Sequence, residues 1–281
     1  MQKFRNFVYK YAIPAAIVIA LAWYGMMIGI SKLFTLLPKS IVVDYIDEVV
    51  QMLFPIGIAI LFGFGGAFKE KGFRKGLICG IALFALQAVV LLFAFIEAAD
   101  NPETKWKPMY LIIYGVVSVF GVAVREESIF RVTVQGVLGK KYGNSTKGVW
   151  TIAIASAIIF GLIHAFNFLM GVELLPAVIQ AVTNVGIGLF FASVYLRGGN
   201  FWSLVLIHTV VDLNGLFKST FCDVNQAAVI SSIPVTSLIA GVVFIAISIF
   251  LLRPSKCKEI VERYNPTKPM EQPVENAEIE Q

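Results

Sequence analysis

Residues 109–139, MYLIIYGVVSVFGVAVREESIFRVTVQGVLG, join an apolar run to four charged residues: Arg125, Glu126, Glu127 and Arg131. The apolar run is long enough to enter a membrane as a helix. Charged residues inside a membrane span cost roughly 2.5–3.5 kcal/mol each, and they usually face a protein interior or a water-filled cavity. The stretch therefore predicts a membrane helix that carries functional polar groups. The alternative is a rim of four charges in water at a helix end.

The composition of the whole chain indicates a membrane protein. Of its 281 residues, 58% are hydrophobic and only 15% are charged, and the mean hydropathy is +0.79. Soluble domains are nearer half apolar and a quarter charged. We interpret the distribution of the net charge of +5 as a sign of membrane topology, and we expect no nucleic-acid partner. The basic N-terminus and the apolar run after it predict a first span that is retained, not a cleaved signal peptide. No disulfide or CxxC motif is expected from the three cysteines.

Apolar segments of about 20 residues predict an all-α, polytopic membrane bundle with about eight transmembrane helices. Residues 1–252 are predicted to form this bundle, with a motif-bearing core at 109–217, and 253–281 a flexible cytoplasmic tail. The expected spans are 11–37, 51–68, 77–97, 109–136, 148–166, 176–196, 201–217 and 228–252.

Basic residues are concentrated in alternate loops, which orients the predicted bundle. By the positive-inside rule, these loops face the cytoplasm, and so do both termini. The loops between them carry Asp and Glu instead, as at Asp47, Asp100 and Asp223. The basic sets include Lys3, Arg5 and Lys10, then Lys69, Lys71, Arg74 and Lys75, and then Lys140, Lys141 and Lys147.

The helical spacing of the charges separates the two glutamates. Glu127 and Arg131 are four residues apart, which places them on one face as an ion pair. Glu126 points about 100° away from that face and is not neutralised by the pair. A carboxylate that is free in this way suits a general base acting on water.

Both histidines of the chain lie in predicted spans. His164 follows Phe160 by four residues, and His208 precedes Asp212 by four, so each pair shares a helical face. Imidazole can bind a metal, carry a proton or donate to an oxyanion. Polar groups in apolar helices are tolerable in a shared wet cavity. We therefore expect Glu126 and both histidines to lie on the scale of ~5–7 Å from one another.

Three short motifs then resemble a known family. EESIFR fits E-E-x-x-x-R, FGLIH fits F-x-x-x-H, and HTVVD fits H-x-x-x-[N/D]. In this order on successive hydrophobic segments, they resemble the CPBP family of intramembrane proteases. That family includes the type II CAAX prenyl endopeptidases and bacterial members described as bacteriocin-immunity (Abi) proteins. The resemblance covers about 120–217, and it implies an eight-helix core in a membrane, here the bacterial plasma membrane.

The resemblance also implies roles for six residues. Glu126 would activate the attacking water, with Glu127 and Arg131 in support. His164 would hold water or a metal, and His208 with Asp212 would bind the tetrahedral oxyanion or complete the site. The prenyl endopeptidases have Asn at the position of Asp212, and an ionised Asp cannot donate a hydrogen bond. Asp212 is therefore protonated, orients His208 or helps to bind a metal.

Several alternatives stay open at this stage. Zn²⁺ held by Glu126, His164, His208 and Asp212 and a metal-free glutamate–histidine site are equally compatible with the motifs. The expected activity is cleavage of a membrane-associated peptide or protein, prenylated or not. Rival functions are a non-catalytic scaffold or regulator, a bacteriocin self-immunity protein and a transporter. A transporter is disfavoured because there is no inverted repeat.

Overall fold

The computed structural model describes residues 2–264, which form helices without a β-strand; a single β-bridge joins Trp106 to Cys222. The α-helices are α1 (Gln2–Lys10), α2 (Ala12–Phe34), α3 (Ile41–Leu61), α4 (Phe73–Asp100), α5 (Met109–Glu127), α6 (Gln135–Tyr142), α7 (Thr146–Ala165), α8 (Leu174–Gly198), α9 (Phe201–Gly215), α10 (Phe217–Phe221), α11 (Gln226–Ser231), α12 (Ser237–Leu251) and α13 (Pro254–Tyr264). A π-helix, η2 (Ser128–Val134), links α5 to α6, and 3₁₀ turns form η1 (Gly65–Lys69) and η3 (Phe166–Met170).

The prediction of a helical membrane protein is confirmed at this level, but the count of eight spans is not. Within the described residues, five helices are long and apolar enough to cross a membrane, or six if the bent α12–α13 pair is one span. Helix α3 has sufficient length, but Asp44, Asp47 and Glu48 fall within its first eight residues. Helix α9 has only 15 residues. Helix α3 is therefore left out of this count because of its acidic residues, and α9 because of its length.

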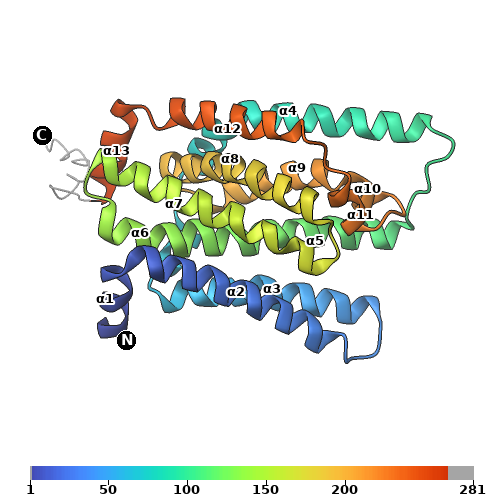
Figure 1. Cartoon of the computed structure of the whole chain (residues 1–281), viewed down its shortest axis with the longest axis horizontal. Coiled ribbons are helices and arrows are strands. Elements are labelled where there is room, and N and C mark those ends of the chain that lie inside the picture. Colours follow the sequence, from blue (N-terminus) through green and yellow to red (C-terminus); the bar gives the residue numbers. More distant parts are fainter. Residues whose placement is uncertain (1, 265–281) are drawn as a thin grey trace, which may run out of the picture.

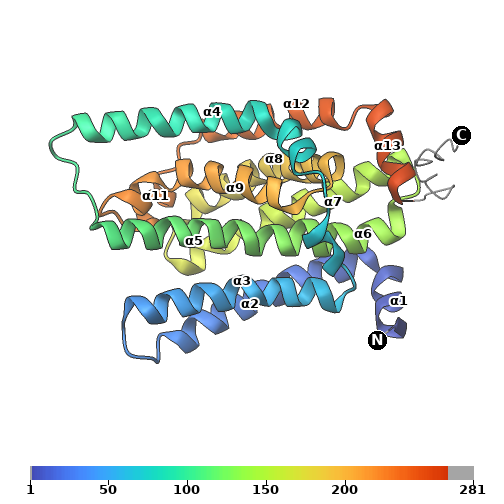
Figure 2. The ribbon, with the colours of Figure 1, turned by 180° about the vertical axis from the view of Figure 1, so that it is seen from behind.

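The helices are arranged in layers (Figures 1 and 2). Helices α2 and α3 form a hairpin along one side, α4 and α12 lie on the opposite side, and α5 to α9 occupy the space between. The N-terminal helix α1 and the last described helix, α13, lie at the same end of the bundle. Which side of the membrane this end faces remains a prediction.

Close approach of α7, α8 and α12 depends on glycine. A Cβ on Gly161 of α7 would lie 2.7 Å from the carbonyl oxygen of Ala181 in α8. A Cβ on Gly186 of α8 would lie 2.2 Å from the carbonyl oxygen of Gly241 in α12. Small residues allow helices to pack backbone to backbone in membranes, where dispersion contacts replace the hydrophobic effect. This packing places α8 directly between α12 and α7, and α7 carries one of the motifs.

A tight turn sets the start of α9. Gly199 ends α8 with a φ of +72°, a conformation that favours glycine. Asn200 then caps α9, because its side-chain oxygen accepts a hydrogen bond from the Ser203 amide at 2.9 Å. The GGN sequence thereby reverses the chain and directs α9, with His208, back into the bundle.

The predicted flexible tail differs from the structure over its first part. Residues 254–264 form α13, in which Cys257 and Ile260 are buried against the bundle. Arg197 at the end of α8 forms an ion pair with Glu259 at 2.7 Å. Hydrogen bonds from Lys256 and Arg197 lower the pKa of Glu259 to about 2. The amphipathic pattern of α13, with Cys257 and Ile260 on its buried face, explains why it docks. Residues 265–281 lie outside the described residues.

Candidate active site

The motif helix changes its hydrogen-bonding register at the candidate site. Helix α5 ends at Glu127, and the chain continues as the π-helix η2, whose seven residues are all buried. The Thr133 hydroxyl donates to the Ser128 carbonyl at 2.9 Å, five residues back. π-Helical turns are rare and are frequently found at functional sites. Glu126 and Glu127 therefore lie where a regular helix gives way to a wider one.

Glu127 is the centre of a fully buried polar network. Its Oε2 accepts a hydrogen bond from Arg131 Nε at 2.9 Å, which is the ion pair that the spacing predicted. Its Oε1 lies 2.8 Å from Nδ1 of His208 in α9. Arg131 also donates to the hydroxyl of Ser156 in α7 at 3.1 Å, and its guanidinium lies 4.8 Å from the Phe160 ring centroid. The network ties three helices together.

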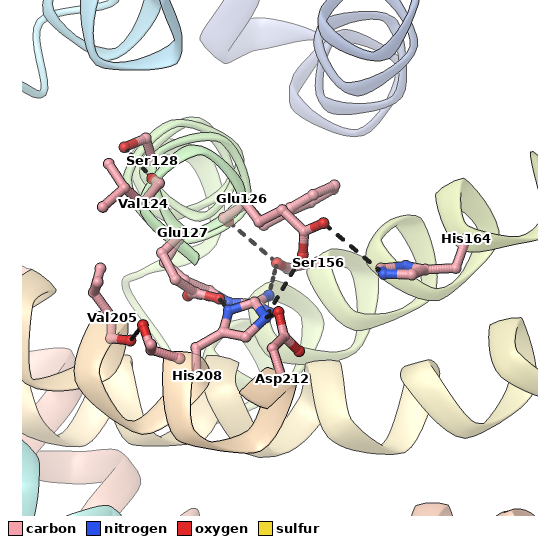
Figure 3. A network of polar contacts seen from close by, with 12 residues as sticks. Val124, Glu126, Glu127, Ser128, Ser156, His164, Val205, His208 and Asp212 are labelled. Atoms are coloured by element: carbon pink, nitrogen blue, oxygen red, sulfur yellow. Dashed lines mark hydrogen bonds and ion pairs between the residues drawn. The ribbon is translucent and has the colours of Figure 1, made fainter. Parts of the chain in front are cut away.

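Glu126 points away from Arg131 and toward the Nε2 atoms of both histidines (Figure 3). Its Oε1 lies 4.0 Å from Nε2 of His164, and its Oε2 lies 3.8 Å from Nε2 of His208. Both distances exceed those of direct hydrogen bonds. Its side chain is 14% exposed, whereas that of Glu127 is fully buried. The structure thus brings the three residues together, with Glu126 on the accessible side.

The contacts of each imidazole define its protonation pattern. Nδ1 of His164 lies 2.8 Å from the Phe160 carbonyl, which can only accept, so Nδ1 carries the proton. In the neutral ring, Nε2 of His164 is then an acceptor that faces Glu126. Nδ1 of His208 donates to Glu127, and Nε2 of His208 lies 3.3 Å from Asp212 Oδ2. The two histidines therefore present different chemistry to Glu126.

Two polar partners of the motif helix were not identified from the sequence. Glu48 of α3 forms an ion pair with Arg125 at 2.6 Å and accepts a hydrogen bond from Ser118 at 3.0 Å. Gly121 leaves the space for this carboxylate, since a Cβ there would lie 2.2 Å from Glu48 Oε1. Ser118, Gly121 and Arg125 share one face of α5, which is the signal that could have indicated a partner. Ser156, the other missed partner, carries no recognisable motif.

In and next to the network lie buried polar atoms without a hydrogen-bond partner among the described residues. These are Nη2 of Arg131 and both amide atoms of Gln135, which lies one turn further along the chain. Gln135 is fully buried. Unpaired polar atoms of this kind are costly, at about 1–3 kcal/mol each.

The suggested zinc ligands do not form a metal-binding group in this structure. No three His, Cys, Asp or Glu side chains within residues 2–264 are placed to hold one metal ion. Both ring nitrogens of His208 face carboxylates, and Nδ1 of His164 faces a backbone carbonyl. We therefore assign no step to a metal.

Comparisons with known proteins support one relationship. Residues 108–214 match a family described as type II CAAX prenyl endopeptidase Rce1-like. The matched segment contains all six residues that the motifs identify, from Glu126 to Asp212. No curated protein and no solved structure matches the chain.

Proposed function

Because residues 108–214 match a family described as type II CAAX prenyl endopeptidase Rce1-like, we propose that this chain is an intramembrane endopeptidase that uses Glu126 to activate water. The observation that carries the proposal is the position of the Glu126 carboxylate between the Nε2 atoms of two histidines. The substrate is a membrane-associated peptide or protein, and the reaction is hydrolysis of one of its peptide bonds.

His164 and Glu126 together orient the attacking water. Both Nε2 of His164 and the Glu126 carboxylate are acceptors, and they lie 4.0 Å apart. A water between them donates one hydrogen to each, which directs its lone pair at the scissile carbonyl. Glu126 takes a proton as the carbon–oxygen bond forms, and it later delivers that proton to the leaving amine as the carbon–nitrogen bond breaks.

His208 is the candidate donor to the tetrahedral oxyanion. Glu127 fixes its ring through Nδ1, which leaves Nε2 beside Glu126 and Asp212. A protonated Nε2 can donate to the negative oxygen that develops on the substrate. Asp212 is the family position at which Asn is expected, and at 3.3 Å from Nε2 it is suited to orienting His208. Its carboxylate then supports the imidazolium and need not donate itself.

Glu127 and Arg131 act as positioning residues in this proposal. Both are fully buried and are held by one another, by His208 and by Ser156. A buried ion pair of this kind fixes geometry and has no free face for a substrate. Their contribution to catalysis is the orientation of His208 and of the helix turn that carries Glu126.

Comparative proteomics of cell membranes tests the proposal and searches for the substrate. Cells that carry the wild-type chain are compared with cells that carry Glu126→Gln, which keeps the shape of the side chain but removes the base. We expect one precursor to accumulate in the variant, and the purified wild-type protein to cleave it. Glu97→Gln, at an exposed glutamate near the end of α4, is the matched control.

Two outcomes would reject the proposal. If Glu126→Gln cleaves the precursor at the wild-type rate, a non-catalytic scaffold becomes the better interpretation. If a chelator abolishes cleavage and Zn²⁺ restores it, the water is activated by a metal and not by Glu126 alone.

A further inference from the structure

An apolar groove of about 620 Å³ lies on the α1–α3 side of the bundle, separate from the candidate active site. It is lined by aromatic rings of α1, by one face of α2 and by the end of α3. Val18, 64% exposed, marks its open side, and Trp23, 4% exposed, marks its inner wall. The Trp23 ring packs edge-on against Phe130 of η2, with centroids 5.5 Å apart. Phe130 thereby closes the groove toward the catalytic residues.

The dimensions of the groove match one leaflet of a bilayer. Along α2, it extends from Pro14 to Met26. Twelve residues of helix rise about 18 Å, which is close to half of a ~30 Å hydrocarbon layer. A chain of methylene groups that enters at the α1 end can therefore lie in the groove down to the middle of the membrane.

Helix α1, whose Phe4 and Phe7 line the groove, also carries exposed cationic side chains. It runs across the end of α2 and not along it (Figure 1). Arg5 donates to the Leu61 carbonyl at 2.7 Å, and the Tyr9 hydroxyl donates to the Phe62 carbonyl at 2.7 Å, so α1 is tied to the end of α3. The exposed Lys3 and Lys10 belong to the same helix, which contains no acidic residue.

The shape of the apolar groove and the lysines of α1 together indicate the class of ligand. Amphipathic helices with lysine on the polar face lie in the interface between water and lipid. Each lysine near such a surface favours anionic lipid by about 1 kcal/mol, which corresponds to roughly a five-fold preference. We propose that this groove binds one acyl chain of an anionic phospholipid, whose phosphate lies between Lys3 and Lys10. This site is independent of the proposed protease activity.

Native mass spectrometry of the full chain tests the headgroup. The protein is purified with equal amounts of phosphatidylglycerol and phosphatidylcholine that carry the same acyl chains. We expect one retained phosphatidylglycerol, favoured by about 25-fold for two lysines, and loss of that preference in the double variant Lys3→Gln with Lys10→Gln. The control pair Lys39→Gln with Lys105→Gln, exposed lysines elsewhere, should keep it. Equal retention of both lipids, or a preference that survives the double variant, overturns the proposal.

The acyl chain is tested separately. Ala22→Phe places a ring in the groove and should abolish lipid retention, whereas Ala85→Phe, at an exposed position of α4, should not. An independent readout keeps the native groove and leaves Trp23 as the sole tryptophan, with Trp106, Trp150 and Trp202 changed to Phe. Phosphatidylglycerol with brominated acyl chains should quench Trp23 fluorescence more strongly than brominated phosphatidylcholine at the same mole fraction. Equal quenching, or a lipid-free dimer that covers the groove, contradicts the assignment.

Discussion

Helices α8 and α2 are both apolar, but they are buried in the bundle to different extents. In α8, 56% of the membrane-capable segment is buried inside the protein, compared with 22% in α2. The polar network of Glu127, Arg131 and His208 lies in the buried part of the bundle, to which α8 belongs. On the α1–α3 side, Gln51 contacts Ser31 at 3.2 Å near the far end of the hairpin, while the groove occupies the α1 end.

The difference shows what an ionisable group requires in a membrane. Glu127 and Arg131 are surrounded by several layers of helix, because an exposed charge in hydrocarbon would be too costly. The α2–α3 hairpin contributes one ion pair to the motif helix, Glu48 with Arg125, and otherwise provides apolar surface. We therefore expect substitutions in the buried network to have large effects and those at the periphery to have small ones.

The largest effect is expected from Glu126→Gln. This change removes the general base, which usually contributes 10²–10⁴-fold to the rate. We expect turnover of the identified substrate to fall by about two to four orders of magnitude, with little change in thermal stability because Glu126 has no direct hydrogen bond among the described residues. Single-turnover cleavage and thermal unfolding in detergent measure the two quantities. Loss of stability in parallel with loss of activity would mean that Glu126 belongs to the structural network.

Arg131→Ala should damage folding most. It leaves the carboxylate of Glu127 buried without its cation, and breaking a buried pair in this way costs roughly 3–5 kcal/mol. We expect lower expression and a lower Tm, together with reduced activity; Arg74→Ala, at an exposed arginine, is the control. A fully stable but inactive Arg131→Ala protein would instead assign Arg131 to substrate binding.

Glu48→Gln tests whether the hairpin is only a support. The change removes one charge from the pair with Arg125 but keeps a polar side chain. We expect a loss of about 1.5–3 kcal/mol in stability, as for hydrogen bonds to charged groups. Activity at a temperature where the protein stays folded should change less than ten-fold. If activity instead falls as far as in Glu126→Gln, the α3 contact is part of the catalytic geometry, and the division between the two regions fails.

Gln135→Leu should be neutral or stabilising, although Gln135 is fully buried at the end of η2. Its amide atoms have no hydrogen-bond partner among the described residues, so an apolar side chain of similar size removes a cost of about 1–3 kcal/mol. Thermal unfolding measures the change, with Gln135→Glu as the contrasting variant that adds a charge. A clearly lower Tm for Gln135→Leu would show that this amide has a polar partner in the membrane.

The smallest effect is expected at α13, where the ion pairs are exposed. The pKa of Glu259 is lowered to about 2 by Lys256 and Arg197, whereas an unfolded glutamate titrates near 4.5. Its contribution is therefore fully present above pH 4.5 and is lost as the pH falls toward 2. Hydrogen exchange of α13 should show weaker protection at pH 2.5 than at pH 5, and no change between pH 5 and pH 7. Altered protection between pH 5 and pH 7 would point to another group.

Residue spacing within one helix predicted the local contacts of the site. The sequence did not predict contacts between residues that are far apart in the chain. The contacts of Glu127 with Arg131 and of His208 with Asp212 follow from residues four apart, and the motifs ordered the three helices that meet at Glu126. Glu48 and Arg125 are 77 residues apart, and no sequence pattern indicates that α3 packs against α5 at that depth. The sequence did not predict the helix at 254–264, because its charged residues resemble those of a solvated tail. Its docking depends on Cys257 and Ile260.

The π-helix η2 makes the length of the motif helix itself a determinant of the site. A π turn holds one more residue between hydrogen-bonded groups than an α turn, so the wider turn accommodates the extra residue and the helix on either side keeps nearly the same phase. The seven residues of η2 turn the chain by nearly the same angle as six residues of a regular helix, so removing one residue from 128–134 would restore a regular helix and leave α6, with its contacts to α7, close to its present orientation relative to Glu126. The extra residue would therefore act locally: its loss would reshape the turn next to Glu126 and Glu127, whereas a deletion within the regular part of α5 would rotate one end of the helix against the other by about 100°.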